Sequence, residues 1–333
     1  MKLIRRRTKI NNIIRRVVRK TKRLSRKRVV RLGCQISVVI LCLFFLGSNL
    51  FRGKALLSDI DISLSHIAYS WLLTTAAILL GALAWWLTLR GIGQHVDMVR
   101  SLRIHLLSNI AKYIPGYAWQ LVGKAYLSKR IGISTNAVGV GMFMELAQLV
   151  LIGIIIAVSQ VPQEIIAKLK ESRIINNNSI LWTILIIVVF LSLSIAIFAV
   201  LKSRNKYFSS ITFLPFYLAG ASISIFAGWL LFGFAFWMIG TSLQPLPLND
   251  VPIFLFTLTA SFLIGLAVIF VPGSLGVRES IMVLILSPVY VSGSLAVVIA
   301  VLSRLVIIIS EFFSALLIVL LARLRSYCGY TEP

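Results

Sequence analysis

The sequence has few acidic residues and no long polar stretch after its first 31 residues. Only 10 of its 333 residues are Asp or Glu, and 13% are charged, whereas soluble domains are about 25% charged. Hydrophobic residues make up 59% and form blocks long enough to cross a bilayer core of about 30 Å. Because a folded soluble domain needs about 50 residues or more, we expect one membrane domain over residues 32–322 and no appended soluble enzyme.

The sequence also has little of what metal sites and enzymes require. Its three cysteines and three histidines form no metal-binding spacing and no disulfide framework, and we expect a lone loop histidine to be solvated. No glycine-rich phosphate-binding loop is visible, and no Asp-x-Asp pair that would hold an activated donor. We therefore expect no metal, no cofactor and no enzymatic activity.

Positive charge is concentrated in the tail formed by residues 1–31, which hold 15 of the 34 Lys and Arg residues. Such a run binds either nucleic acid or anionic lipid headgroups. Because the tail leads directly into a hydrophobic span, we favour a cytoplasmic anchor at the membrane surface and expect no nucleic-acid partner. No small-x-small cleavage site follows residues 32–50, which predicts an uncleaved first helix and not a signal peptide.

The long apolar runs predict an all-α, polytopic integral membrane protein with about eight membrane segments. The segment near 281–292 is short, so it either spans the membrane or re-enters it. The expected segments are 32–50, 68–89, 137–159, 179–201, 213–240, 252–271, 281–292 and 295–322.

Loop charges predict the orientation. The stretch 90–130 carries seven Lys and Arg residues and 202–206 carries three, whereas 241–251 carries none. The positive-inside rule then places both termini, including the tail 323–333, on the cytoplasmic side of the inner (plasma) membrane. The stretch 90–136 is too polar to span but rich in apolar residues, which predicts amphipathic helices that lie on the cytoplasmic face or dip into it.

Two Pro-Gly dipeptides, Pro115-Gly116 and Pro272-Gly273, interrupt the apolar sequence. Pro removes a backbone donor and Gly permits unusual dihedral angles, so each dipeptide predicts a helix break. Paired breaks in corresponding positions of two halves indicate a transporter's central site, although the rest of the halves does not align. The alternative is two ordinary surface turns. Trp119, beside the first break, either anchors the interface or lines a headgroup entrance.

Charged residues inside or beside the spans are candidates for function, because a central charge costs about 2.5–3.5 kcal/mol on insertion scales. One interpretation is a buried ion pair, such as Arg304 with Glu145 or Glu311, that fixes helix packing. The other is an anion site of phosphate size, since the planar guanidinium of arginine matches phosphate oxygens. The candidate headgroup-binding residues are Lys112, Glu145, Arg278, Glu279, Arg304 and Glu311.

The two breaks resemble motifs of the flippase-like membrane domain family that includes the transmembrane region of lysylphosphatidylglycerol synthases. Asn109 to Gln120 is similar to its Asn…Tyr-Ile-Pro-Gly…Trp signature. Pro272 to Glu279, with Gly276, is similar to its Pro-Gly-Gly-Leu-Gly-Val-Arg-Glu motif, and Arg304 matches an arginine of its final helix. The resemblance covers roughly residues 35–322.

The sequence departs from the family pattern at two positions. Ser274 replaces the usual glycine, and Leu146 stands after Glu145 where the family often has arginine. The second departure weakens a role for Glu145 through a neighbouring arginine. Because we expect no soluble aminoacyl-transferase domain, lysyl transfer does not carry over, and the resemblance implies only a lipid-translocating or lipid-handling domain.

These observations lead to three functional hypotheses. The first is a flippase for a phospholipid or a polyprenyl-phosphate-linked glycolipid, with membrane lipids as its ligands. The alternatives are a non-catalytic partner of a glycosyltransferase or aminoacyl-transferase, and a membrane-embedded headgroup transferase in which Glu279 would act as base. The sequence also allows a homo-oligomer. Without an ATP-binding loop, any driving force must come from a gradient, a partner or downhill lipid flow.

Overall fold

The computed structural model describes Phe44, Ser48 and residues 62–113, 119–162, 212–268, 276–287 and 290–327. Every regular element in these ranges is a helix, as the sequence predicted. Five of the helices are long and apolar enough to cross a membrane. The tail 1–31 and the spans expected at 32–50 and 179–201 lie outside the described residues, apart from Phe44 and Ser48.

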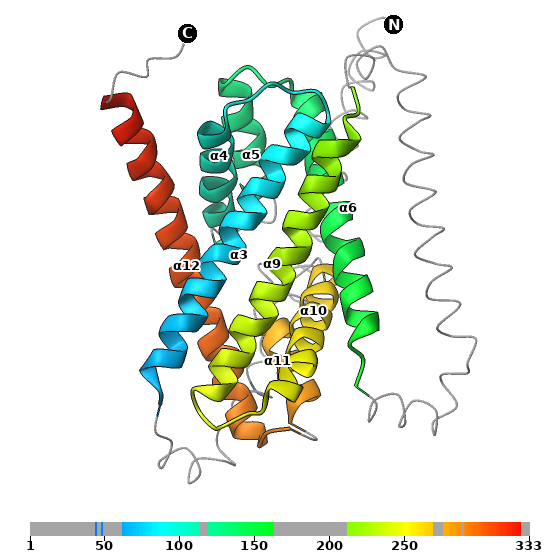
Figure 1. Cartoon of the computed structure of the whole chain (residues 1–333), viewed down its shortest axis with the longest axis vertical. Helices are drawn as coiled ribbons and strands as arrows, with labels where there is room; N and C mark the ends of the chain where they lie inside the picture. The colour runs from blue at the N-terminus through cyan, green and yellow to red at the C-terminus, as the bar shows by residue number, and fades with distance from the viewer. Residues whose placement is uncertain are drawn as a thin grey trace, which may run out of the picture.

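Two long antiparallel helices form the centre of the molecule: α3 (Leu64–Gly91) and α9 (Pro215–Thr241) lie side by side along their length (Figure 1). Small buried residues such as Ala77 and Gly228 allow this close approach, which is the usual way membrane helices associate. Two hydroxyl groups also bridge the helices, with Ser70 Oγ donating to the Ala235 carbonyl and Ser224 Oγ to the Leu80 carbonyl, both at 2.9 Å.

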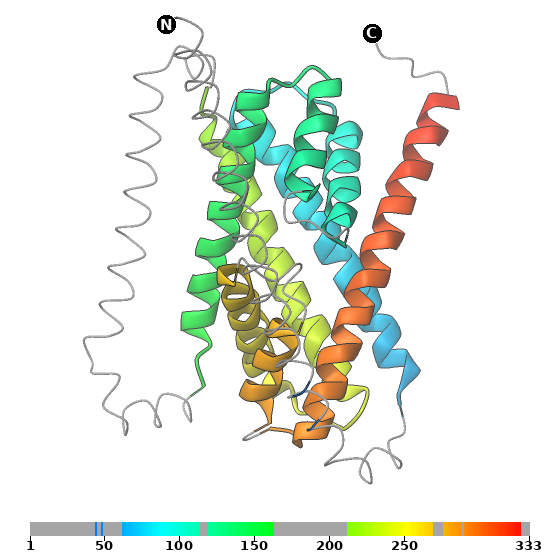
Figure 2. The ribbon, with the colours of Figure 1, turned by 180° about the vertical axis from the view of Figure 1, so that it is seen from behind.

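The polar stretch 90–136 forms a helical hairpin. Helix α4 (Met98–Ile110) and the 3-10 turn η1 (Ala111–Tyr113) lead to the first break, and α5 (Trp119–Arg130) follows it. At about 1.5 Å per residue, α4 and α5 are each about 20 Å long or less, too short to cross the bilayer core. In Figures 1 and 2 both lie in the half of the molecule where α3 ends and α9 begins. The hairpin packs against α3, α6 and α12, so it dips into the protein, the second of the two arrangements predicted.

A second helical hairpin enters from the opposite end. Helix α10 (Val251–Ala267) rises to about mid-height in Figures 1 and 2, and α11 (Val277–Leu286) returns toward the same end. Helix α11 is only 10 residues long and ends two residues before Pro288, so the short segment expected near 281–292 exists but begins and ends earlier. At about 15 Å it is too short to span.

The two halves of the described chain have the same order of elements in opposite directions. One half is α3, the hairpin α4–α5 and α6 (Thr135–Ser159). The other is α9, the hairpin α10–α11 and α12 (Gly293–Tyr327). Helices α3 and α9 run in opposite directions, as do α6 and α12 (Figure 2). This is the arrangement of an inverted-topology repeat, in which transporters place their sites between the halves at mid-membrane.

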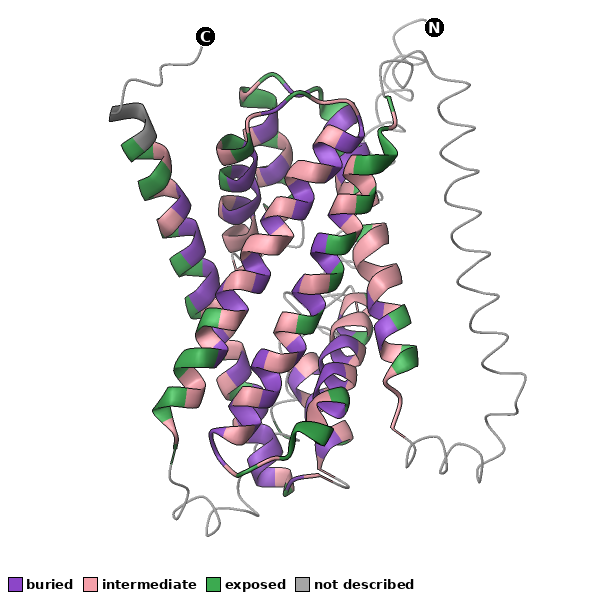
Figure 3. Ribbon diagram, viewed as in Figure 1, coloured by how far each residue is buried: buried purple, intermediate pink, exposed green. Residues whose placement is uncertain are grey.

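The outer faces of the helix bundle carry many exposed apolar side chains. Buried residues lie toward the centre of the bundle, and exposed ones lie on its outside and ends (Figure 3). Large apolar side chains are among the exposed residues, including Ile223 on α9 and Ile309 on α12. A water-soluble protein rarely exposes so much contiguous apolar surface, so these faces fit contact with lipid.

Candidate functional site

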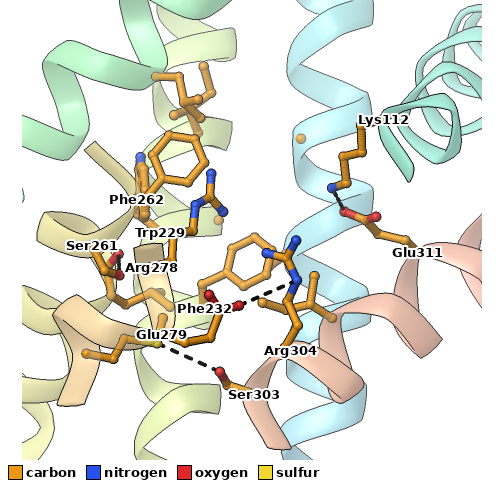
Figure 4. A pocket seen from close by; sticks show the side chains of 18 residues that line it. Lys112, Trp229, Phe232, Ser261, Phe262, Arg278, Glu279, Ser303, Arg304 and Glu311 are labelled. Carbon is orange, nitrogen blue, oxygen red and sulfur yellow. Dashed lines mark hydrogen bonds and ion pairs between the residues drawn. The ribbon is translucent and has the colours of Figure 1, made fainter. Parts of the chain in front are cut away.

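A cavity of ≈ 180 Å³ lies between the second hairpin, the long helices α3, α9 and α12, and the turn η1 of the first hairpin. Its walls come from both halves of the molecule, because α3, η1 and α6 of the first half face α9, α10, α11 and α12 of the second. The lining combines aliphatic and aromatic side chains with a few charged ones (Figure 4). Five candidates named from the sequence line it: Lys112, Arg278, Glu279, Arg304 and Glu311.

Four of the five charged side chains that line the cavity form two ion pairs. Arg304 Nε lies 3.8 Å from Glu279 Oε1, which joins α12 to α11. Lys112 Nζ donates to Glu311 Oε1, which joins the first hairpin to α12, and Tyr113 OH donates to Glu311 Oε2 at 2.8 Å. The sequence suggested a pair of Arg304 with Glu145 or Glu311. In the structure Arg304 pairs with Glu279, and Glu311 pairs with Lys112.

Lys112 and Arg304 each form an ion pair, whereas Arg278 forms none with the described residues. Its guanidinium carbon lies 4.3 Å from the centroid of the Phe262 ring, a cation–π contact. Within the described part of the chain, Arg278 Nε is buried without a hydrogen-bond partner, as is Glu279 Oε2. Figure 4 shows the Arg278 side chain beside Phe262 and Trp229, across the cavity from Lys112 and Glu311. A buried donor without a partner is costly, so this group is suited to an anionic ligand.

The start of α11 adds backbone donors beside Arg278. Gly276 has a φ of 80°, a conformation that a side chain with Cβ rarely adopts. Gly276 is the N-cap residue of α11, whose first turn carries Arg278 and Glu279. The first amides of a helix have no partner within the helix, so they favour an anion together with the helix dipole.

The formal charge of the cavity favours an anion. Three cations (Lys112, Arg278 and Arg304) and two carboxylates (Glu279 and Glu311) line it, which gives 3 − 2 = +1 when all five are ionised. Among the described residues, no group of three or more His, Cys, Asp or Glu side chains is arranged to hold a metal ion. The chemistry on offer is electrostatic binding of a negatively charged group.

Glu145, the sixth candidate, is not among the residues that line this cavity. Its carboxylate accepts a hydrogen bond of 2.5 Å from Lys124 Nζ, and its Oε1 lies 3.1 Å from His105 Nδ1. The structure therefore brings five of the six predicted residues together and puts the sixth in a separate cluster.

His105 and Lys124 are site residues that the sequence interpretation missed. His105 was expected to be solvated but is 8% exposed, because α4 dips between other helices, and Lys124 is 3% exposed. One signal was available: His105, Asn109 and Lys112 are spaced by four and three residues, which puts them on one face of a helix. The depth of that helix was not readable from the spacing.

Four residues of the break motifs, Pro115, Gly116, Pro272 and Gly273, lie outside the described residues. Trp119 begins α5 and is 51% exposed, in keeping with either role predicted for it. The cavity also contains aromatic residues that the sequence did not single out as site residues, notably Trp229 and Phe262, whose rings meet edge to face with centroids 5.1 Å apart.

The comparison with known families identifies the class of protein. The chain matches the lysylphosphatidylglycerol synthase TM region over residues 30–315. It therefore belongs to this family of multi-pass membrane domains, as its motifs indicated, and its function is connected with membrane lipids. No curated protein matches the chain.

Proposed function

We propose that the protein translocates a lipid with an anionic headgroup between the two leaflets of the inner membrane. The observation that carries this proposal is a cavity with a surplus cation, Arg278, at the junction of two hairpins that enter from opposite ends. A site between inverted halves can open to one side at a time while the ligand stays in place. The lipid-related family membership supports the same reading.

The roles of the residues follow from their contacts. Arg278 and the first amides of α11 bind a phosphate oxygen, and Arg304, held by Glu279 at 3.8 Å, provides the second guanidinium. Lys112 and Glu311 link the first hairpin to α12 and would move with any change in the relative position of the halves. Acyl chains remain in the lipid phase beside the apolar outer faces.

The distribution of basic residues supports the orientation. Arg90, Arg100, Lys129 and Arg130 all lie at the ends of elements facing the first-hairpin side, and Asp250 is the charged residue of the described loop at the other end. By the positive-inside rule the first hairpin enters from the cytoplasm. The second hairpin then enters from the opposite side.

The decisive experiment measures leaflet exchange of headgroup-labelled phospholipids in liposomes that contain the purified protein. Arg278→Ala should slow exchange by about tenfold or more, because a hydrogen bond to a charged group contributes about 1.5–3 kcal/mol. Arg278→Lys keeps the charge but loses the planar fork, so it should recover only part of the rate. Arg100→Ala, an exposed arginine on α4, is the matched control and should behave as wild type.

Three outcomes would count against the proposal. Full exchange by Arg278→Ala, with normal elution in detergent, would remove Arg278 from the site. Chemical conversion of the labelled lipid by the purified protein would favour a headgroup transferase. No exchange of any phospholipid or polyprenyl-linked lipid, together with co-purification of a transferase, would favour a non-catalytic partner.

A further inference from the structure

A second buried cluster of charged side chains lies between α4, α5 and α6, outside the lipid cavity. Lys124 Nζ lies 2.5 Å from Glu145 Oε2 and 3.1 Å from His105 Nδ1. Lys124 Nζ also lies 3.6 Å from the centroid of the Trp85 ring. The proposed lipid site uses none of these groups, although burying them is costly.

Neighbouring amides define the protonation state of His105. Gln120 Nε2 donates to Asn109 Oδ1 at 2.6 Å, which turns Asn109 Nδ2 toward His105 Nε2 at 3.0 Å. A ring nitrogen that accepts a hydrogen bond carries no proton, so the ring proton is on Nδ1. Nδ1 lies 3.1 Å from both Glu145 Oε1 and Lys124 Nζ. Of these two groups only the carboxylate can accept the proton, and the ammonium group disfavours a second positive charge on the ring. His105 is therefore neutral in this arrangement, and Lys124 and Glu145 balance each other.

The helices around His105 present few groups that could accept or balance another proton. Helix α5 presents Lys124 and α6 presents Glu145. Helix α3 presents the uncharged Trp85 and Gly81, and α12 contributes the more distant Glu311, which attracts a proton but is already held by Lys112. One added proton would give the closed cluster a net charge of +1, which favours a conformation that admits water.

The cluster is mechanically connected to the lipid cavity. His105 and Asn109 lie on α4, and Lys112 lies in the turn η1 that directly follows it. The Lys112 ammonium group forms an ion pair with Glu311 of α12 at the cavity wall. A shift of α4 that hydrates His105 would therefore move the Lys112–Glu311 pair. The His105 cluster and the lipid cavity are thus connected through α4 and the turn η1.

We propose that His105, Lys124 and Glu145 form a proton-binding site that couples lipid translocation to a transmembrane proton gradient. This inference rests on the proposed translocation and names its energy source. Protonation on one side of the membrane favours the hydrated state of the first hairpin, and release on the other side restores the arrangement described here. Linkage of this kind needs only that the two states bind the proton with different affinities.

The test is the steady-state distribution of a headgroup-labelled phospholipid in proteoliposomes with an imposed pH difference of one unit. Coupling of one proton per lipid allows a leaflet ratio of up to about tenfold. We expect wild type to approach that ratio and both His105→Gln and Glu145→Gln to give a ratio near one. His95→Gln makes the same change at an exposed histidine next to Arg90 and should match wild type.

Exchange without a gradient separates this inference from the proposed function. Wild-type exchange with a leaflet ratio of one under the gradient would overturn proton coupling and leave translocation standing. A gradient-dependent ratio that survives in His105→Gln and Glu145→Gln would overturn the assignment of the site. No wild-type exchange at all would refute translocation and, with it, the coupling. If His105→Gln and Glu145→Gln still exchange lipid in the absence of a pH gradient, both variants are folded.

Nitrogen-15 NMR of the imidazoles gives a readout that does not depend on transport. The chain has three histidines, so the His105 signal is the one lost in His105→Gln. A neutral ring with the proton on Nδ1 is expected, and its titration should change in Glu145→Gln. A ring that carries its proton on Nε2, or whose titration ignores Glu145, would overturn the site.

Discussion

Glu311 shows how a carboxylate is accommodated on a spanning helix. Its side chain is 8% exposed, and both of its oxygens accept hydrogen bonds, one from Lys112 and one from Tyr113. The Tyr113 ring is itself stacked on Phe312, with centroids 6.1 Å apart. The carboxylate is thus stabilised by an element from the other half of the chain, and each partner depends on the other.

Removing one member of the Lys112–Glu311 pair should therefore lower the stability of the protein more than removing both. Lys112→Met leaves Glu311 buried without its cation, and we expect a loss of about 3 kcal/mol of stability, seen as a lower apparent melting temperature in detergent. The double variant Lys112→Met, Glu311→Gln removes the uncompensated charge and should recover most of the loss.

Lys129→Met, at the exposed end of α5, is the control for the loss of a lysine and should melt as wild type does. Equal melting temperatures for Lys112→Met and the double variant would show that the pair does not stabilise the first hairpin against α12.

At the scale of elements, α9 and α10 approach each other closely at Gly233. A Cβ built on Gly233 of α9 would lie 2.4 Å from Leu255 Cδ1 and 3.1 Å from Leu255 Cα on α10. The second of these atoms belongs to the backbone and cannot turn away. Glycine at 233 therefore lets α10 approach α9 closely, and a larger residue would have to displace the Leu255 side chain and shift its backbone by a few tenths of an ångström.

Gly233→Ala should separate α9 from α10 and destabilise the protein by about 1–3 kcal/mol, the usual effect of overpacking. Gly139→Ala on α6 is the opposite case, because nothing lies within 4 Å of the built Cβ, so it should be neutral or add up to about 1 kcal/mol of helix stability. Thermal unfolding of both variants in the same detergent measures the difference, and equal melting temperatures would contradict the packing argument.

At the scale of the whole molecule, the inverted repeat has a consequence for topology. The end of α5 and the loop between α9 and α10 must lie on opposite sides of the membrane, because the two hairpins enter from opposite ends. Lys129 is exposed at the first position and Leu248 is 67% exposed at the second.

Cysteine labelling tests this arrangement. With Cys34, Cys42 and Cys328 replaced by serine, Leu248→Cys should react with a membrane-impermeant maleimide added to spheroplasts, and Lys129→Cys should react only after permeabilisation. Labelling of both positions from the same side would contradict the inverted arrangement, and the reverse pattern would contradict the proposed orientation.

The sequence by itself determined the helical membrane class, the limits of α3, α6, α9 and α12 to within a few residues, and the family. Length and hydropathy suffice for this because lipid leaves few structures available to the backbone. It also identified five charged residues of the cavity, because a charge inside the membrane is costly and is usually kept for a function. These are Lys112, Arg278, Glu279, Arg304 and Glu311.

Only the tertiary structure decided which charges meet. Lys112 and Glu311 are 199 residues apart, and no periodicity connects them. The structure also moved Glu145 away from Arg304 and into contact with His105 and Lys124. Contacts of this kind depend on how two hairpins fold back into the bundle, and local sequence encodes where a helix breaks but not which distant helix faces the break.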